Sequence, residues 1–309
     1  DFERPVVELS ERIERLKREG SSSAGEIARL SSRLGELEKK VYGDLDPWDR
    51  VQLARHPSRP TSLDYIARIC DEFEELHGDR YYADDPALLG GLARIGGVPF
   101  MVIGQEKGRT TKEKIARNFG MVKPEGYRKS LRLLKLAEKF GIPVLSLVDT
   151  QGAYPGIDAE ERGQPRAIAD NLREAFGIRT RIIVVIIGEG GSGGALAVAI
   201  GDEILMMEHA VYSVITPEGC AAILWKTREK APEAAAALKL TSKDCLEYGV
   251  IDAIIEEPHG AAHRDPDSAA GIIRDEVLER LKRLNDIPID RLLSMREEKF
   301  FSMGRFDEQ

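Results

Sequence analysis

The residues with the clearest chemical potential form a glycine-rich run, Gly188-Glu-Gly-Gly-Ser-Gly-Gly-Ala195. It joins residues 181–188, the most continuously apolar stretch of the chain, to a short helix predicted from about Gly193 to Ile200. Glycine is needed where backbone approaches another molecule or takes a positive φ, and amides at the N-terminus of a helix favour negative charge. The run is therefore a candidate anion or oxyanion site.

A dinucleotide site, a hydrolase site and a purely structural role compete for this run. Five glycines among residues 188–194 exceed what a tight strand-to-helix turn needs. The dinucleotide pattern G-x-G-x-x-G fits, but the following helix is short and Ser213 stands where the ribose-binding acid should be. Ser192 fits a nucleophile elbow, with Asp252 and His259 following in the order that hydrolases use, yet no strongly placed base accompanies it.

The remaining possibility is an oxyanion hole made of backbone alone, with the amides of Gly193 and Gly194 as donors. Such a hole serves chemistry that passes through an enolate or a polarised urea carbonyl, and it requires no side-chain nucleophile. A bulky side chain at either position should block the approach of a substrate.

A second candidate feature is a basic segment, residues 107–139, within an acidic chain. It contains eleven Lys or Arg and three Glu, a net charge of +8, whereas the whole chain carries −8. Such a segment can attract an anionic ligand, an acidic partner or nucleic acid, or it can be the solvated face of a helix. We place the ligand contacts on the residues that precede the predicted helix: Lys107, Arg109, Lys112, Lys114 and Arg117.

Single residues elsewhere have their own interpretations. Tyr154 follows a predicted strand, at the end where open α/β sheets bind ligands. Glu218 is expected to stabilise the start of a helix. His56 and His209 are expected to be structural, and Trp225 to be buried in a core or an interface.

The elements that position these residues alternate between strands and helices after residue 90. Strands are predicted at residues 98–104, 142–148, 181–188, 203–207, 211–215 and 250–255. Helices are predicted at residues 124–140, 164–176, 193–200 and 267–284. Continuously apolar strands between helices indicate an α/β protein with a largely parallel sheet covered on both faces.

The first 45 residues differ from the rest. Heptad-like apolar stripes predict two short helices, joined by a flexible turn at residues 20–25. Neither helix is long enough to be stable alone in water, so we expect them to pack on each other, on the body or on a partner. The predicted division is an N-terminal helical arm at residues 1–45 and one domain at residues 46–309.

Composition excludes several classes of protein. A net charge of −8 over 309 residues disfavours a protein built mainly to bind nucleic acid. No apolar run approaches the roughly 20 residues that span a bilayer, and no apolar signal core precedes Arg4. Cys70, Cys220 and Cys245 are too far apart in sequence to indicate a disulfide framework or a zinc site. We therefore expect a cytoplasmic protein with reduced thiols and no metal.

Several long ordered blocks of the sequence belong to one pattern: Arg117-Asn-Phe-Gly-Met121, Asp149-Thr-Gln-Gly-Ala-Tyr-Pro-Gly156, Ala159-Glu-Glu-Arg-Gly-Gln164, the run from Gly188 to Ala195, and Tyr212-Ser-Val-Ile-Thr-Pro-Glu-Gly-Cys220. In these blocks the sequence resembles the carboxyltransferase alpha subunits of bacterial acetyl-CoA carboxylases. Gln151 departs from the pattern, since many relatives have proline there.

The resemblance implies a crotonase-like spiral of ββα units, with helices at both ends. It also implies an enzyme that moves CO2 from carboxybiotin to acetyl-CoA and gives malonyl-CoA for fatty-acid synthesis. In this family the hole matched by Gly193 and Gly194 is thought to hold the biotin carbonyl. The other residues that we expect to bind substrate are Gly152, Ala153, Tyr154, Gly190, Gly191 and Ser192, together with the five basic residues named above.

The partners implied are a homologous beta subunit in an α2β2 assembly, a separate biotin carboxyl carrier protein and a biotin carboxylase. The sequence has no Met-Lys-Met for biotin attachment and no glycine loop with a following lysine for ATP.

Two alternatives stay open. One is a stand-alone crotonase-type acyl-CoA hydratase or hydrolase that uses Glu218 or Ser192, and the other is a non-catalytic subunit that binds anions or nucleic acid.

Overall fold

A mixed β-sheet organises the computed structural model, which describes residues 2–19 and 24–304. Across these residues eight strands follow the order β1-β2-β3-β4-β5-β6-β8, and β7 pairs with β5 beside this path. The β1–β2 and β2–β3 pairs are antiparallel, and β3 to β8 pair in parallel. The predicted largely parallel sheet is confirmed. The strands are β1 Glu72–Glu75, β2 Leu88–Ile95, β3 Val98–Gln105, β4 Val144–Thr150, β5 Ile182–Gly191, β6 Glu203–Met207, β7 Val211–Ser213 and β8 Ala253–Ile255.

The centre of the sheet is its most apolar part, because every residue of β4 and β5 is buried. This explains why both strands are predictable from their continuous apolar runs. The antiparallel end is different, since β1 reads Glu72-Phe-Glu-Glu75 and carries no apolar alternation. Its neighbours β2 and β3 form a hairpin that turns at Gly96 and Gly97, whose φ values are 55° and 79°. Glycine reaches such values without strain.

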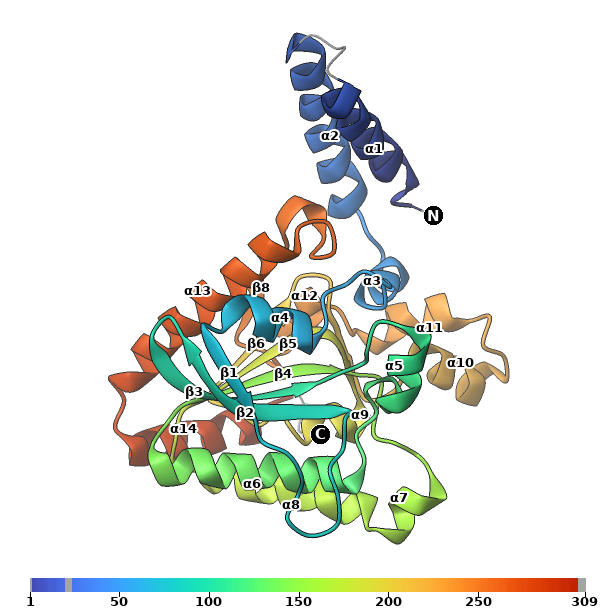
Figure 1. Ribbon diagram of the computed structural model, residues 1–309. Coiled ribbons are helices and arrows are strands. Elements are labelled where there is room, and N and C mark those ends of the chain that lie inside the picture. Colours follow the sequence, from blue (N-terminus) through green and yellow to red (C-terminus); the bar gives the residue numbers. More distant parts are fainter. Residues whose placement is uncertain (1, 20–23, 305–309) are drawn as a thin grey trace.

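Helices cover both faces of the sheet, as Figure 1 shows. On one face lie α6 (Pro124–Phe140), α8 (Gln164–Gly177) and α14 (Ile289–Phe301), and on the other lie α4 (Ser62–Ile69) and α13 (Pro266–Asn285). The predicted helices at residues 124–140, 164–176 and 267–284 are confirmed. The remaining helices outside the N-terminal arm are α3 Pro47–Ala54, α5 Thr111–Ala116, α7 Ile157–Glu161, α9 Ser192–Leu196, α10 Pro217–Trp225, α11 Ala231–Leu238 and α12 Ser242–Glu247, with 3-10 turns at Asn118–Gly120 and Pro258–Gly260.

Helix α14 is held by a buried arginine that sequence patterns do not single out. The Arg296 guanidinium donates to Asp202 Oδ1 at 2.8 Å and Oδ2 at 2.9 Å, and to the carbonyl oxygens of Ala175, Ile178 and Thr180. A buried arginine with all of its donors paired fixes the helix against the end of α8 and the start of β5.

No helix within residues 2–19 and 24–304 combines the length and the apolarity that crossing a bilayer requires. The three cysteines are free thiols in this structure.

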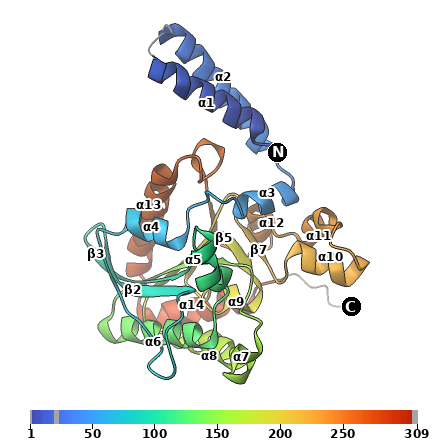
Figure 2. The same ribbon diagram turned by 45° about the vertical axis from the view of Figure 1, so that its right-hand side comes forward.

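The N-terminal arm is a helical hairpin that stands off the body in Figures 1 and 2. It consists of α1 (Arg4–Glu19) and α2 (Ala24–Gly43), which pack on each other around the buried Ile13. The base of the hairpin shares an apolar cluster with Leu53 of α3 and with Ala261. Packing of the helices on each other and on the body is confirmed. Most of the predicted turn lies outside the described residues, and the division at residue 45 stays a prediction.

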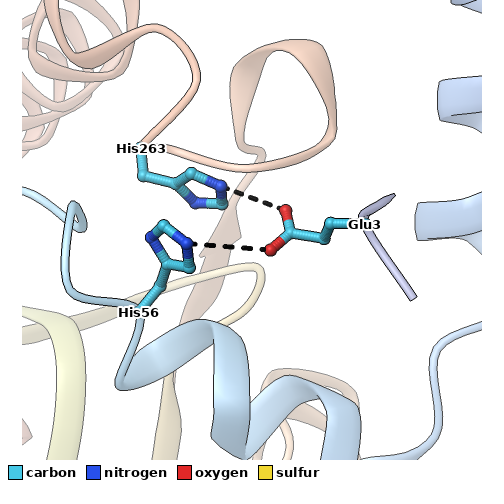
Figure 3. A group of neighbouring side chains, drawn as sticks. All are labelled: Glu3, His56 and His263. Atoms are coloured by element: carbon cyan, nitrogen blue, oxygen red, sulfur yellow. Dashed lines mark ion pairs between the residues drawn. The ribbon is translucent and has the colours of Figure 1, made fainter. Parts of the chain in front are cut away.

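A polar clasp ties the arm to the body. It is formed by Glu3, His56 and His263, which Figure 3 shows, together with Tyr42. Glu3 Oε1 lies 3.0 Å from His263 Nε2 and accepts a 2.6 Å hydrogen bond from the Tyr42 hydroxyl. Glu3 Oε2 lies 4.0 Å from His56 Nε2, and the two imidazole rings stack with centroids 3.9 Å apart. The clasp therefore joins the start of α1, the end of α2 and two loops of the body.

Two imidazoles and a carboxylate are also a set that can bind a metal ion. However, the Ser58 amide donates a 3.2 Å hydrogen bond to His56 Nδ1. A neutral His56 then carries its proton on Nε2, which faces Glu3, so no lone pair is left for a metal. The clasp thus combines hydrogen bonds from Tyr42 and His263 to Glu3 with a longer contact from His56, and His56 has the structural role that the sequence predicts.

The clasp should weaken in acid. Burial alone would raise the pKa of Glu3, but hydrogen bonds from His263 and Tyr42 outweigh it and lower that pKa from 4.5 to about 2. Burial and the neighbouring His263 lower the pKa of His56 below 6.5. Both groups hold fewer protons in the folded chain than in the unfolded one, so folding loses stability as pH falls below 6.5 and again below 4.5. The second loss belongs to the arm, because Glu3 is the group of the arm that gains protons there.

We predict that Glu3→Gln loosens the arm. Removal of a charged acceptor costs on the order of 1.5–3 kcal/mol, so backbone amides of α1 and α2 should exchange hydrogen about tenfold faster or more at neutral pH. Hydrogen exchange followed by mass spectrometry measures this. The control is Glu8→Gln, which removes only an exposed pair with Arg4. Equal exchange in the two variants would contradict a docking role for Glu3.

Candidate active site

The glycine-rich run forms a sharp junction in which β5 passes directly into α9. Ser192, the first residue of α9, has a φ of 57°, a left-handed value that strains a residue with a side chain. Helix α9 ends at Leu196, so the prediction that it extends to Ile200 is wrong. A turn follows, in which the Ala197 amide donates to the Gly193 carbonyl and the Ala199 amide to the Leu196 carbonyl.

The amides at this junction are free to act as donors. The first amides of a helix have no acceptor within the helix, and those of Gly193 and Gly194 donate to no other acceptor in the part of the chain that the structure describes. The Ala153 amide, in the loop after β4, is equally without an acceptor among the described residues. The strand ends of β4 and β5 therefore bring several unpaired donors together.

Gly194 is wedged against the loop after β4. A Cβ atom at this position would lie 2.3 Å from the Ala153 nitrogen and 2.5 Å from the Gly152 carbonyl carbon, so only glycine fits. A Cβ atom at Gly193 would contact only the Ile168 side chain, at 3.7 Å. A side chain at position 194 would therefore displace backbone, whereas one at position 193 would project into open space.

Two buried side chains that sequence reasoning missed hold this wedge from behind. Gln105, at the end of β3, donates to the Gly194 carbonyl at 2.9 Å, and the Tyr127 hydroxyl of α6 donates to the same oxygen at 3.1 Å. Gln105 Oε1 accepts from the Asp149 amide at 3.2 Å. The Gln105 amide thus links β3, β4 and α9, and it sets the direction in which α9 begins.

Two cavities flank the junction, and both are lined in part by Ser192 and Val214. The first, of about 580 Å³, is lined by three of the predicted binding residues, Gly152, Ala153 and Tyr154. The second, of about 460 Å³, includes Gly193 in its wall. The junction therefore borders open space on two sides, as a site for a substrate must.

Gly190 and Gly191 have a packing role in this chain. Both are buried, and a Cβ at position 190 would lie 2.5 Å from the Tyr212 ring. A Cβ at position 191 would lie 2.2 Å from the Gln151 carbonyl oxygen. These two glycines allow the end of β5 to lie close to β7 and to the loop after β4.

A third cavity, of about 600 Å³, is lined by charged side chains. Lys107 Nζ lies 2.7 Å from Glu189 Oε2 and 2.7 Å from Asp149 Oδ1, and Arg55 Nε donates to Glu189 Oε1 at 2.7 Å. Burial opposes ionisation of Glu189, but Lys107 and Arg55 outweigh it and lower its pKa to about 2. These four charges largely neutralise one another.

Some cations of the basic segment already have hydrogen-bond or ion-pair partners, and others have none among the described residues. Lys107 is held by its two carboxylates, Arg109 pairs with Asp64, and Arg117 donates to the Pro86 carbonyl at 2.6 Å. Within the described residues, the ammonium groups of Lys112 and Lys114 have no hydrogen bond or ion pair, and Lys114 lines the charged cavity. The same cavity includes Arg228, an exposed and unpaired cation that sequence reasoning missed because it lies 111 positions beyond Arg117.

The residues required by the hydrolase alternative are not brought together. Asp252 pairs with Lys299 at 2.6 Å, and His259 lies 3.7 Å from Asp265. No described base contacts the Ser192 hydroxyl. Glu218 stands in the first turn of α10 as predicted, and it accepts hydrogen bonds from Arg55.

Two further predictions can now be judged. His209 is buried and contacts Arg50 Nη1 through Nδ1 at 2.8 Å, so its predicted structural role is confirmed. Trp225 is 41% exposed, so the prediction that it belongs to a core is wrong within this chain. Its neighbours Ile223 and Leu224 are each 62% exposed, which leaves an apolar surface at the end of α10.

Comparisons with known proteins agree on one family. Residues 1–304 match the family model described as acetyl co-enzyme A carboxylase carboxyltransferase-like. The chain is 52% identical over 308 residues to the acetyl-coenzyme A carboxylase carboxyl transferase subunit alpha of Pseudomonas paraeruginosa, covering 98% of each. It is 54% identical over 312 residues to the subunit of that name from Burkholderia vietnamiensis, covering 100% of this chain and 97% of the relative.

Solved structures with lower identity share the fold. Transcarboxylase 12S gives a TM-score of 0.56 at 21% identity, over 71% of this chain and 44% of that one. The beta subunit of Pseudomonas aeruginosa geranyl-CoA carboxylase gives 0.58 at 17%, over 79% and 46%. A Pseudomonas malonate decarboxylase gives 0.60 at 16%, over 77% and 92%. The predicted crotonase-like α/β fold, with helices at both ends, is confirmed.

We predict that Gln105→Glu destabilises the junction. A carboxylate at position 105 has no N–H to donate, so one of its oxygens would face the Gly194 carbonyl oxygen without a hydrogen bond. Leaving that buried carboxylate oxygen unpaired costs about 1–3 kcal/mol. Urea unfolding should report this loss in the free energy of unfolding. Gln52→Glu, on the exposed side of α3, is the control and should leave the unfolding midpoint unchanged. A midpoint for Gln105→Glu that equals the wild-type value would refute the role of this residue.

Proposed function

Because this chain belongs to the acetyl-coenzyme A carboxylase carboxyltransferase family, we propose that it is the alpha half of an enzyme that moves CO2 from carboxybiotin to acetyl-CoA. The product is malonyl-CoA, the first committed intermediate of fatty-acid synthesis. One observation carries this proposal, namely the unpaired amides of Gly193 and Gly194 at the start of α9, where Gly193 lines a cavity.

The chemistry needs stabilisation of negative charge more than it needs a side-chain base. When carboxybiotin releases CO2, negative charge develops on the ureido oxygen. The amides of Gly193 and Gly194 would donate to that oxygen, and the loss of one such donor costs roughly 3–4 kcal/mol. The deprotonated biotin nitrogen would then take a proton from the methyl group of acetyl-CoA, and the resulting enolate would attack the released CO2 to form the new carbon–carbon bond of malonyl-CoA. This sequence of steps is consistent with the lack of a described base near Ser192.

Substrate contacts are proposed from two of the cavities. Gly152, Ala153 and Tyr154 would contact the reacting groups from the 580 Å³ cavity. Lys114 and Arg228, which line the same charged cavity, would attract the phosphates of CoA together with Lys112, because these cations are not already paired within the described residues. Lys107, Arg109 and Arg117 would act indirectly, by holding the loop that carries Lys114.

The partners are proposed from the family and from the exposed surface. The apolar end of α10, residues 223–225, is suited to burial against a beta subunit in an α2β2 assembly. Carboxybiotin would arrive on a biotin carboxyl carrier protein that is loaded by a biotin carboxylase. A cytoplasmic location, as expected from the separate cysteines, is part of the same proposal.

The function can be tested with the complex of this chain and its beta subunit, by malonyl-CoA-dependent carboxylation of free biotin. Gly193→Val should retain a folded complex, since position 193 has open space, and should lose activity about 100-fold or more because the side chain covers the amides. Gly271→Val, on α13 and equally open, is the control and should retain activity. No activity in the wild-type complex, or full activity in Gly193→Val, would refute the proposal.

A further inference from the structure

The charged cavity and the N-terminal arm share one segment of the chain, the connection between α3 and α4. Residues 54–57 and Arg59 of this connection line the cavity of about 600 Å³. His56 is one of these residues, and its ring also belongs to the clasp that holds the arm (Figure 3). The arm and the cavity therefore contact the same short stretch of backbone.

The two arginines of this connection are fixed within the body. Arg55 is held by two glutamates that also line the cavity. Arg59 is buried, and its guanidinium donates to Glu257 Oε1 at 2.6 Å, to Glu257 Oε2 at 3.0 Å and to the Ile187 carbonyl oxygen at 2.8 Å. The ring of His56, which lies between them in sequence, instead contacts the arm. The turn at His56 is therefore the part of this cavity wall whose position depends on the arm.

The arm also covers the second body loop of the clasp. Tyr42 packs so closely on this loop that a Cβ atom at Gly260 would lie 1.9 Å from a carbon of its ring. The Ala262 amide donates to Glu257 Oε2 at 2.6 Å, and the same carboxylate holds Arg59 of the cavity wall. Both body loops that meet the arm are thus linked to the charged cavity.

We propose that docking of the arm and binding of the CoA phosphates in the charged cavity are coupled, with Glu3 and Tyr42 as positioning residues. This inference rests on the proposed function, which assigns those phosphates to the cavity that Lys114 and Arg228 line. A ligand that binds a wall already held by the arm does not bear the entropic cost of ordering that wall. Each event therefore favours the other, and by linkage the effect is equal in both directions.

A direct electrostatic effect of Glu3 would have the opposite sign. Its carboxylate is ionised at neutral pH, since its pKa is lowered to about 2, and a negative charge near the cavity repels phosphate. Glu3→Gln would then improve the binding of an acyl-CoA, whereas the coupling predicts weaker binding. Tyr42→Phe separates the two effects further, because it removes the 2.6 Å hydrogen bond to Glu3 and changes no charge.

The first test measures kcat and apparent KM values for malonyl-CoA and free biotin, using the complex of this chain with its beta subunit. Glu3→Gln should raise the KM for malonyl-CoA about fivefold or more and Tyr42→Phe about threefold or more, while kcat and the KM for biotin stay within about twofold. The matched controls are Glu8→Gln and Tyr81→Phe, both at exposed positions, which should leave all three values unchanged.

The second test follows hydrogen exchange in the wild-type complex. CoA should slow the exchange of the backbone amides of α1 and α2 about threefold or more, because binding in the cavity favours the docked arm. Pantetheine, which lacks the phosphates, should leave their exchange unchanged. This measurement decides if the variants do not assemble.

The outcomes separate the coupling from the proposed function. If the wild-type complex carboxylates biotin, but neither variant raises the KM for malonyl-CoA and CoA does not slow exchange in the arm, the coupling is wrong and the function stands. A loss of kcat, or an equal rise in both KM values, would indicate a general structural role and overturn the inference. A lower KM for malonyl-CoA in Glu3→Gln would also overturn it. A wild-type complex that carboxylates no biotin refutes the function itself, and the exchange measurement then judges the coupling on its own.

Discussion

The contact between Gly194 and the loop at Gly152 and Ala153 is the constraint on which the site depends. It lets α9 and the loop after β4 approach so closely that no Cβ atom fits between them. Parallel strands end at the same edge of a sheet, so this approach collects unpaired backbone amides at one point. Gln105 and Tyr127 fix the contact from the buried side through the Gly194 carbonyl. The donors are therefore held by elements that do not themselves meet a substrate.

The charged side chains near this point are paired with one another, so they add little net charge beside the backbone donors. Glu189, which directly precedes Gly190 and Gly191, would bring negative charge toward the junction if it were unpaired. It is held instead by Lys107 and Arg55, and Arg55 also contacts Glu218 of α10. This network joins the loop after β3, the end of α3 and the start of α10. A site that stabilises developing negative charge benefits when neighbouring charges are already compensated.

The parts of the structure that could be predicted are those with a local signal. The apolar run of β5 and the capped helix α6 both carry such signals, and the glycine run marks the junction between strand and helix. The missed parts depend on distant contacts. The pairing of Arg296 with Asp202, which lies 94 positions away, has no local signal, and β1 has no apolar alternation. Gln105 is a similar case, since its significance comes only from the Gly194 carbonyl, 89 positions along the chain. The basic segment was predicted from charge alone, which cannot separate Lys107 from Lys114.

The exposed apolar end of α10 has a consequence for how this chain is produced. Ile223 and Leu224 present contiguous apolar surface to water in the isolated chain. Surfaces of this kind attract other unassembled copies and the quality-control machinery that removes orphan subunits. Surplus copies would therefore be lost to self-association or degradation, and a cell gains from synthesising this chain in step with whatever covers α10. The apolar surface that suits assembly with a partner would therefore make an excess of this chain unfavourable.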